Sequence, residues 1–134
     1  MTWFSEAQLE EYVLSLLAEA GWVAVHGVTI APGEPAAERS DYREVILERR
    51  LLDAVRALNP HLPEHAVRDV VDTVRRPESQ VAASENWRFY QLLTQGVPVE
   101  YRAATGRVKA VRAALVDWAN PSANALVAVN QFTI

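Results

Sequence analysis

The chain has 134 residues, of which half are apolar and 22% are charged, and its formal net charge is −4. This length suffices for one domain with a hydrophobic core. The negative balance excludes a chain-wide attraction to DNA, so any nucleic-acid contact must come from local arginine clusters or from other parts of a larger protein. Because the chain contains no cysteine, disulfides, thiolate nucleophiles and cysteine-ligated zinc are excluded.

The sequence carries no signal for export or for membrane insertion. Its first residues lack the basic flank and the long apolar core of a signal peptide. No apolar run approaches the ~20 residues that a membrane span needs. We therefore expect a cytoplasmic protein without a membrane partner, in keeping with the lack of cysteine.

Four helices are predicted along the first part of the chain. Ser5 begins a capping-box pattern that opens the first helix. Ser40 and Asp41 are expected to cap the second helix, which ends at Asn59 because the residue before a proline disfavours helical geometry. The predicted helices run over residues 5–20, 40–59, 63–76 and from about 79 or 84 to 95.

Apolar side chains recur at helical spacing and define the predicted core faces of these helices. In the fourth helix, Trp87, Tyr90, Leu92 and Leu93 are expected to be the buried anchors. The four tryptophans of the chain are accordingly assigned to the core rather than to a surface that stacks on bases. The clearest stripe belongs to the third helix and consists of Ala66, Val67, Val70, Val71 and Val74.

The pattern changes to strands in the last part of the chain. Residues 22–30 alternate only weakly and are left open between a short strand and an ordered arm. Strands are predicted at residues 97–102, 108–118 and 125–133, with turns between them. We expect these three to pair as an antiparallel meander. Four helices followed by three strands, without alternation, is an α+β pattern.

Neither the histidines nor any standard catalytic motif indicates a catalytic or metal site in this sequence. His61 and His65 share a spacing that suits a metal on a helix, but Pro63 places His61 before the helix, so a surface or capping role is favoured. The sequence contains neither a nucleophile elbow around a serine nor a glycine-rich loop for phosphates.

Three carboxylates remain as candidates for a functional site. Glu6 and Glu10 lie four residues apart on one face of the first helix, where they are either solvated charges or a pair that helps to hold a divalent cation such as Mg²⁺. Asp117 stands between Val116 and Trp118 in an apolar strand pattern. A carboxylate in such a setting is either paired or functional.

Several segments resemble the N-terminal region of the R (restriction, HsdR) subunit of type I restriction enzymes, in this order and at this spacing. The resemblance covers residues 5–134, and one departure is Ala125, where a polar or acidic residue usually stands. The segments are "FSEAQLEEYVLSLLAEAGW", "ERSDYREVILERRLLDAVRALNPHLPEHAV", "NWRFYQLLTQGVPVEYR", "LVDWANP" and "LVAVNQFTI".

The resemblance implies that residues 1–134 form a single, incomplete N-terminal part of a nuclease domain of the PD-(D/E)xK, restriction-endonuclease-like type. In such domains carboxylates hold Mg²⁺, and a lysine helps a water to attack the phosphodiester. The resemblance also implies ATP-driven motor domains, DNA as substrate, modification and specificity subunits as partners, and S-adenosylmethionine bound through those partners.

The resemblance carries over to a few residues of this chain. A helix glutamate near the start often faces the metal in this nuclease class, which implies metal-site roles for Glu6 and, second, Glu10. The chain holds one lysine, Lys109, and has Arg107 two positions before it, so no E-x-K is present, and we expect the chain to be inactive alone. The positions expected to shape the site are Asp117, Asn130 and Gln131.

Two other functions compete with the nuclease hypothesis. The chain ends on "ALVAVNQFTI", and an open apolar edge strand favours pairing with another chain. A non-catalytic interaction module, or a truncated gene product that pairs through this last strand, is therefore the alternative. A small DNA-binding domain is disfavoured by the acidic balance and the lack of a basic stripe.

Overall fold

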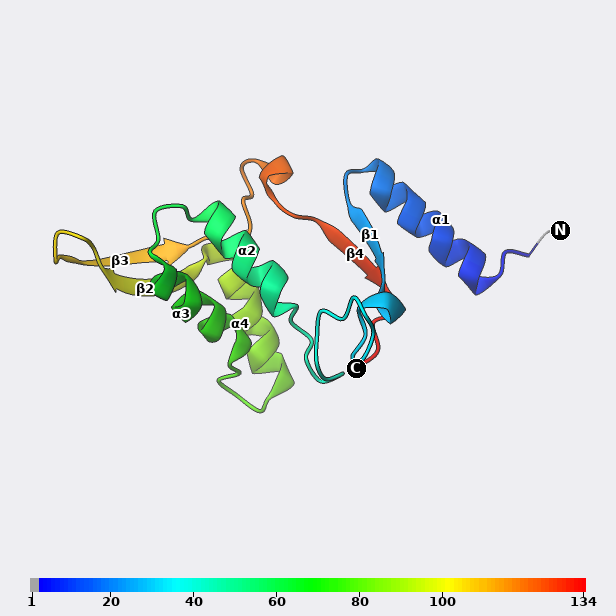
Figure 1. Cartoon of the computed structure of the whole chain (residues 1–134), viewed down its shortest axis with the longest axis horizontal. Coiled ribbons are helices and arrows are strands. Elements are labelled where there is room, and N and C mark those ends of the chain that lie inside the picture. Colours follow the sequence, from blue (N-terminus) through cyan, green and yellow to red (C-terminus); the bar gives the residue numbers. More distant parts are fainter. Residues whose placement is uncertain (1–2) are drawn as a thin grey trace. The chain divides into compact units, whose positions relative to one another are not determined.

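The computed structural model describes residues 3–134, which divide into two compact units (Figure 1). Unit 1 comprises Met1–Leu47 and Ala125–Ile134, and unit 2 comprises Glu48–Asn124. Within the described residues there are four α-helices and two small sheets, in agreement with the α+β class. The assignment of residues 1–134 to one nuclease domain stays a prediction, and each unit is described by itself.

Unit 1 begins with helix α1 (Glu6–Glu19), and its capping box is formed as predicted. The Gln8 N–H donates to Ser5 Oγ at 3.2 Å, and the Ser5 N–H donates to Gln8 Oε1 at 2.9 Å. After a turn at Gly21, the chain forms strand β1 (Val23–His26) and then the short 3-10 helix η1 (Gly27–Ile30). The segment left open by the sequence is therefore a strand that runs into a helical turn.

Strand β4 (Val127–Asn130) pairs with β1 in parallel, with Val23 opposite Val127 and His26 opposite Asn130. The predicted antiparallel meander is therefore wrong in its third strand. The predicted strand over residues 108–118 also ends early, at Ala113. The turns and the 3-10 helix η2 (Pro121–Ala123) that follow form too long a connection for a hairpin. The last strand thus pairs with a segment about a hundred residues earlier in the sequence.

The predicted start of the second helix is wrong, because helix α2 spans Glu48–Leu58. The side chains of Ser40 and Asp41 form local turns instead of capping a helix. Ser40 donates from its Oγ to Glu44 Oε1 at 2.7 Å, and Asp41 Oδ1 accepts the N–H of Arg43 at 2.8 Å. Polar side chains that bond to the nearby chain compete with helix formation in this way.

Unit 2 packs α2, α3 (Glu64–Arg75) and α4 (Ala82–Gln95) with the antiparallel hairpin of β2 (Val97–Arg102) and β3 (Val108–Ala113). The predicted stripe of α3 is confirmed, because all five of its side chains are buried. Strand β2 alternates strictly between buried and exposed residues. Its buried residues, which join the core, are Val97, Val99 and Tyr101.

The prediction that the tryptophans and the α4 aromatics are buried is wrong. Trp87 and Tyr90 are 61% and 56% exposed, and their rings stack on each other with their centroids 5.4 Å apart. Trp118 is also exposed, and its indole N–H donates to the Leu93 carbonyl at 3.0 Å. Of the predicted anchors of α4, Leu92 is the one in the core. Helical spacing identifies a face, but it does not say whether another element covers that face.

Asn59, which ends α2, joins the helix to the end of β3. The residue is 2% exposed. Its amide nitrogen donates to the carbonyls of Val55 and Ala114, both at 2.9 Å, and its carbonyl oxygen accepts the Ala114 N–H at 2.8 Å. The side chain therefore satisfies the N–H and carbonyl of Ala114, and it adds a second hydrogen bond to the Val55 carbonyl, which also accepts the Asn59 N–H.

Candidate functional site

The candidate site lies in unit 1, where the chain leaves β4. Gln131 donates from its amide nitrogen to Glu10 Oε1 on α1 at 2.9 Å. Gln131 also has a positive φ of 48°, which is uncommon for a residue other than glycine. Two of the predicted site residues, far apart in the sequence, are thus brought into direct contact.

Asn130, the residue before Gln131, lies against the start of η1. Its side-chain carbonyl accepts the N–H of Gly27 at 3.3 Å. A Cβ on Gly27 would lie 2.3 Å from the Asn130 carbonyl oxygen and 2.6 Å from that of Gln131. Glycine is therefore required where the two backbones approach this closely. The sequence reasoning missed Gly27, because a single glycine beside a short strand gives only a weak signal.

The acidic face of α1 is open to solvent. Glu6 is exposed in the first turn of α1, and Glu10 is half-buried one turn later. Glu11 lies 3.9 Å from His26 Nδ1, and both side chains are more than half exposed. This pair adds no buried charge to the site, since exposed pairs are strongly screened.

The described residues do not make a complete metal site. No group of three histidine, cysteine, aspartate or glutamate side chains able to hold a metal occurs within residues 3–134. Mg²⁺ requires an octahedral set of oxygen ligands, and Glu10 already accepts a hydrogen bond from Gln131. Glu6 and Glu10 therefore offer at most part of such a set, and their role towards a metal stays a prediction.

Asp117 belongs to unit 2 and organises a turn. Its Oδ1 accepts the N–H groups of Ala119 and Asn120 at 3.1 and 3.0 Å. Asn124 closes the same turn, because its Oδ1 accepts the Asp117 N–H and its Nδ2 donates to the Asp117 carbonyl. Such side-chain bonds to nearby backbone are typical of aspartate and asparagine in turns. Of the two roles left open by the sequence, Asp117 has the paired one.

Arg39 joins the loop after η1 to the chain that follows β4. The residue is 4% exposed, and its guanidinium lies 3.9 Å from the centre of the Phe132 ring. It donates to the carbonyls of Thr133 at 2.6 Å and Tyr42 at 3.0 Å, while its Nε has no hydrogen-bond partner among the described residues. Sequence reasoning missed this role, because it assigned the neighbouring Ser40 and Asp41 to the start of a helix.

A small pocket of about 180 Å³ adjoins these contacts in unit 1. Arg39 contributes one wall, and Gly27 and Gln131 contribute another. The pocket is thus formed by the three segments that β1, β4 and the loop bring together. Its other lining residues are Val28, Ala31, Glu34, Tyr42 and Thr133.

The sequence matches a known family over almost its whole length. The family described as "Type I restriction enzyme R protein N terminus (HSDR_N)" matches residues 4–134. The chain therefore belongs to the family of N-terminal regions of type I restriction enzyme R proteins.

Two curated relatives support this assignment. The HindI endonuclease subunit of a type I restriction enzyme from Haemophilus influenzae is 36% identical over 130 residues, which cover 97% of the chain. A protein of Methanocaldococcus jannaschii, provisionally named the MjaIXP endonuclease subunit of a type I restriction enzyme, is 29% identical over 94% of the chain. The chain spans 12% of the length of each relative. No solved structure gives a significant match to the chain.

Among residues 3–134, no helix combines the length and the apolar character needed to cross a bilayer.

Proposed function

We propose that the chain is the N-terminal part of the R subunit of a type I restriction enzyme, a Mg²⁺- and ATP-dependent endonuclease that cleaves and translocates DNA. The match of residues 4–134 to the family of R protein N-termini carries this proposal. The hydrogen bond between Gln131 and Glu10 supports the metal-facing role of Glu10. It holds an acidic side chain of α1 at the end of β4, within a segment that matches the family. An oriented carboxylate at the end of a parallel strand pair suits a nuclease metal site.

The residues of unit 1 have distinct roles in this proposal. Glu10, with Glu6 second, supplies carboxylate oxygens to Mg²⁺, and Gln131 orients the Glu10 carboxylate. Asn130 fixes the end of β4 through Gly27. When bound, Mg²⁺ supplies Lewis-acid activation of water and of the phosphodiester. Asp117 shapes the turn that leads towards β4.

The rest of the proposed enzyme lies outside this chain. ATP hydrolysis, the remaining metal ligands and the E-x-K lysine belong to other parts of the R subunit. DNA recognition and S-adenosylmethionine belong to the specificity and modification subunits, and the assembly works in the cytoplasm. We expect the chain alone to leave plasmid DNA intact in the presence of Mg²⁺. If the isolated chain did cleave DNA, and if Glu6→Ala abolished that cleavage, the proposal that this chain is an incomplete nuclease would be contradicted.

The main test uses the R subunit assembled with its modification and specificity subunits. We expect Glu10→Gln to reduce DNA cleavage by one to several orders of magnitude while ATP hydrolysis persists, because the substitution removes one metal-facing charge. Glu19→Gln, at the other end of α1, is the matched control. Normal cleavage by Glu10→Gln and by Glu6→Gln would contradict the proposed site. A reading frame that encodes no aspartate and E-x-K downstream of codon 134 would contradict the nuclease assignment itself.

A second candidate is the non-catalytic module that pairs through its last strand. The observation that favours it is that β4 has one strand neighbour, β1, among the described residues. A two-stranded sheet is marginally stable, and an open strand edge can pair with another chain. We expect the isolated chain to self-associate in sedimentation experiments. A stable monomer with slow amide exchange throughout residues 125–133 would count against this candidate.

A further inference from the structure

The β2–β3 hairpin of unit 2 carries a concentration of positive charge in a chain whose net charge is −4. Glu100 is the one acidic residue of residues 97–113. The four cationic side chains of the hairpin are exposed, as is the turn between its strands. These side chains, called here the hairpin cations, are Arg102, Arg107, Lys109 and Arg112.

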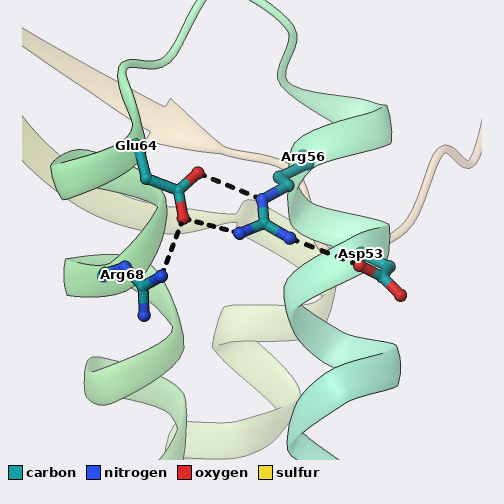
Figure 2. A network of polar contacts seen from close by, with 4 residues as sticks. All are labelled: Asp53, Arg56, Glu64 and Arg68. Atoms are coloured by element: carbon teal, nitrogen blue, oxygen red, sulfur yellow. Dashed lines mark hydrogen bonds and ion pairs between the residues drawn. The ribbon is translucent and has the colours of Figure 1, made fainter.

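The hairpin cations differ from most of the arginines that lie on, or directly after, the helices of the same unit. Glu64 binds both Arg56 and Arg68, at 2.6 and 3.2 Å (Figure 2). None of the hairpin cations is in an ion pair with any acidic side chain of residues 3–134. Their charge is therefore available to an outside partner. The arginines in ion pairs are Arg56, Arg68, Arg75 and Arg88 on the helices, and Arg76 directly after α3.

The register of the hairpin spreads this charge along both of its faces. Lys109 lies opposite Tyr101, whereas Arg112 lies opposite Pro98 on the other face. Arg107 stands beside the turn, and Arg102 is braced across that turn by donating to the Gly106 carbonyl at 2.8 Å. Figure 1 shows the turn extending beyond the helices of unit 2. Within unit 2, the helices therefore leave the charged end of the hairpin uncovered.

We propose that the β2–β3 hairpin is a contact for the phosphate backbone of double-stranded DNA. This inference rests on the proposed function, which makes DNA the substrate. Cations that are not in internal ion pairs can neutralise phosphates and release counterions without first breaking an ion pair. A two-stranded ribbon also fits the major groove of B-DNA. The proposed contact is made to phosphates, so it positions the duplex and carries no sequence information of its own.

The test measures binding of the 134-residue chain to a short fluorescent duplex by anisotropy, at about 50 to 200 mM salt. Arg107→Ala/Lys109→Ala removes two hairpin cations. We expect weaker binding and a logarithmic salt slope shallower by about 1.8, because each lost phosphate contact accounts for ~0.9. Arg68→Ala/Arg76→Ala removes the same charge from exposed positions on α3 and directly after it, and is the matched control. It should bind nearly as the unaltered chain does.

Several outcomes would overturn the hairpin contact. These are an absence of DNA binding even at low salt, and equal losses in the two double variants. Poly-glutamate that competes as strongly as DNA would instead assign the hairpin to an acidic protein partner. Thermal unfolding of each variant controls for folding, and Arg107→Lys with Lys109→Arg should restore binding if charge is what matters. None of these outcomes bears on the nuclease assignment, which the Glu10→Gln experiment tests separately.

Discussion

The two units of the chain are held together by different kinds of interaction. Unit 2 has a hydrophobic core in which the valines of α3 and β2 are buried. In unit 1, Leu14 and Ile30 are the buried apolar side chains among the described residues. The close backbone approach at Gly27 and the buried guanidinium of Arg39 hold unit 1 together instead.

Unit 1 also exposes more apolar surface. Trp3, Phe4 and Tyr12 on and before α1 are 85%, 79% and 60% exposed, and Val23 of β1 is 59% exposed. Most of the predicted site residues lie in this unit, the exception being Asp117. The comparison indicates that unit 2 is stabilised by apolar burial, whereas unit 1 depends on a few specific contacts. Functional segments are commonly drawn from such less stable parts of a protein.

The largest loss of stability is expected at Gly27 of unit 1, where the backbone leaves no room for a side chain. Gly27→Ala places a Cβ 2.3 Å from the Asn130 carbonyl oxygen, which is backbone and cannot move aside cheaply. We expect a loss of roughly 3 kcal/mol in the local stability of the β1–β4 pair, in the range of severe overpacking. Amide exchange should accelerate in Val23–His26 and Val127–Asn130, while the α3 amides keep their protection.

Gly33→Ala in the same unit separates the clash from backbone strain. Gly33 has a φ of +88°, but a Cβ there would meet nothing within 4 Å. Its substitution should therefore cost only the left-handed strain, about 1 kcal/mol. Equal exchange rates in the two variants would show that the close approach at Gly27 does not hold the pair together.

Local signals in the sequence predicted the parts of the fold that are locally determined. The capping box at Ser5 and the buried stripe of α3 require only residues a few positions apart. The parallel pairing of β1 with β4 joins residues about a hundred positions apart, and no local pattern encodes it. The meander was predicted because neighbouring strands usually pair with each other.

The candidate site was predictable only in part, for the same reason. Glu10 was singled out from its spacing to Glu6 and from the family resemblance, and Gln131 from the resemblance, but their contact depends on the long-range pairing of the strands. The role of Arg39 was missed, because its partners are carbonyl groups and a ring brought near by the fold. Asp117 was recognised as a carboxylate that needs a partner, and its partners are backbone N–H groups.

A smaller effect is expected from the buried polar junction of unit 2. Asn59→Ala leaves the N–H and carbonyl of Ala114 without their partners. An unsatisfied buried polar group costs about 1–3 kcal/mol, so we expect a loss of roughly 2 kcal/mol in the free energy of unfolding. Urea denaturation followed by circular dichroism measures it. Asn86→Ala, at an exposed position of α4, is the control and should change little. Equal midpoints for the two variants would show that the junction is not stabilising.

The smallest effect concerns the ion-pair network on α2 and α3 (Figure 2). The hydrogen bonds from Arg56 lower the pKa of Glu64 below its ordinary value of 4.5, and the same contact raises the pKa of Arg56. A carboxyl group with a lowered folded-state pKa stabilises the protein above its unfolded pKa. That contribution disappears as the pH falls through the lowered value. It is modest, because exposed pairs are screened by solvent.

Glu64→Gln should therefore lower the unfolding midpoint of unit 2 slightly at neutral pH, and by less as the pH falls below 4.5. The glutamine keeps the size of the side chain but removes the charge that Arg56 and Arg68 share. Asp69→Asn on α3 removes the same charge at an exposed position and is the matched control. Thermal unfolding across this pH range at low salt measures the difference. A contrary result would be a difference in unfolding midpoint between Glu64→Gln and the unaltered chain that stays constant with pH. That result would mean that the stability lost in the variant came from packing or from neutral hydrogen bonds. In that case the network would not stabilise unit 2 through its charge, and the apolar core would account for its stability.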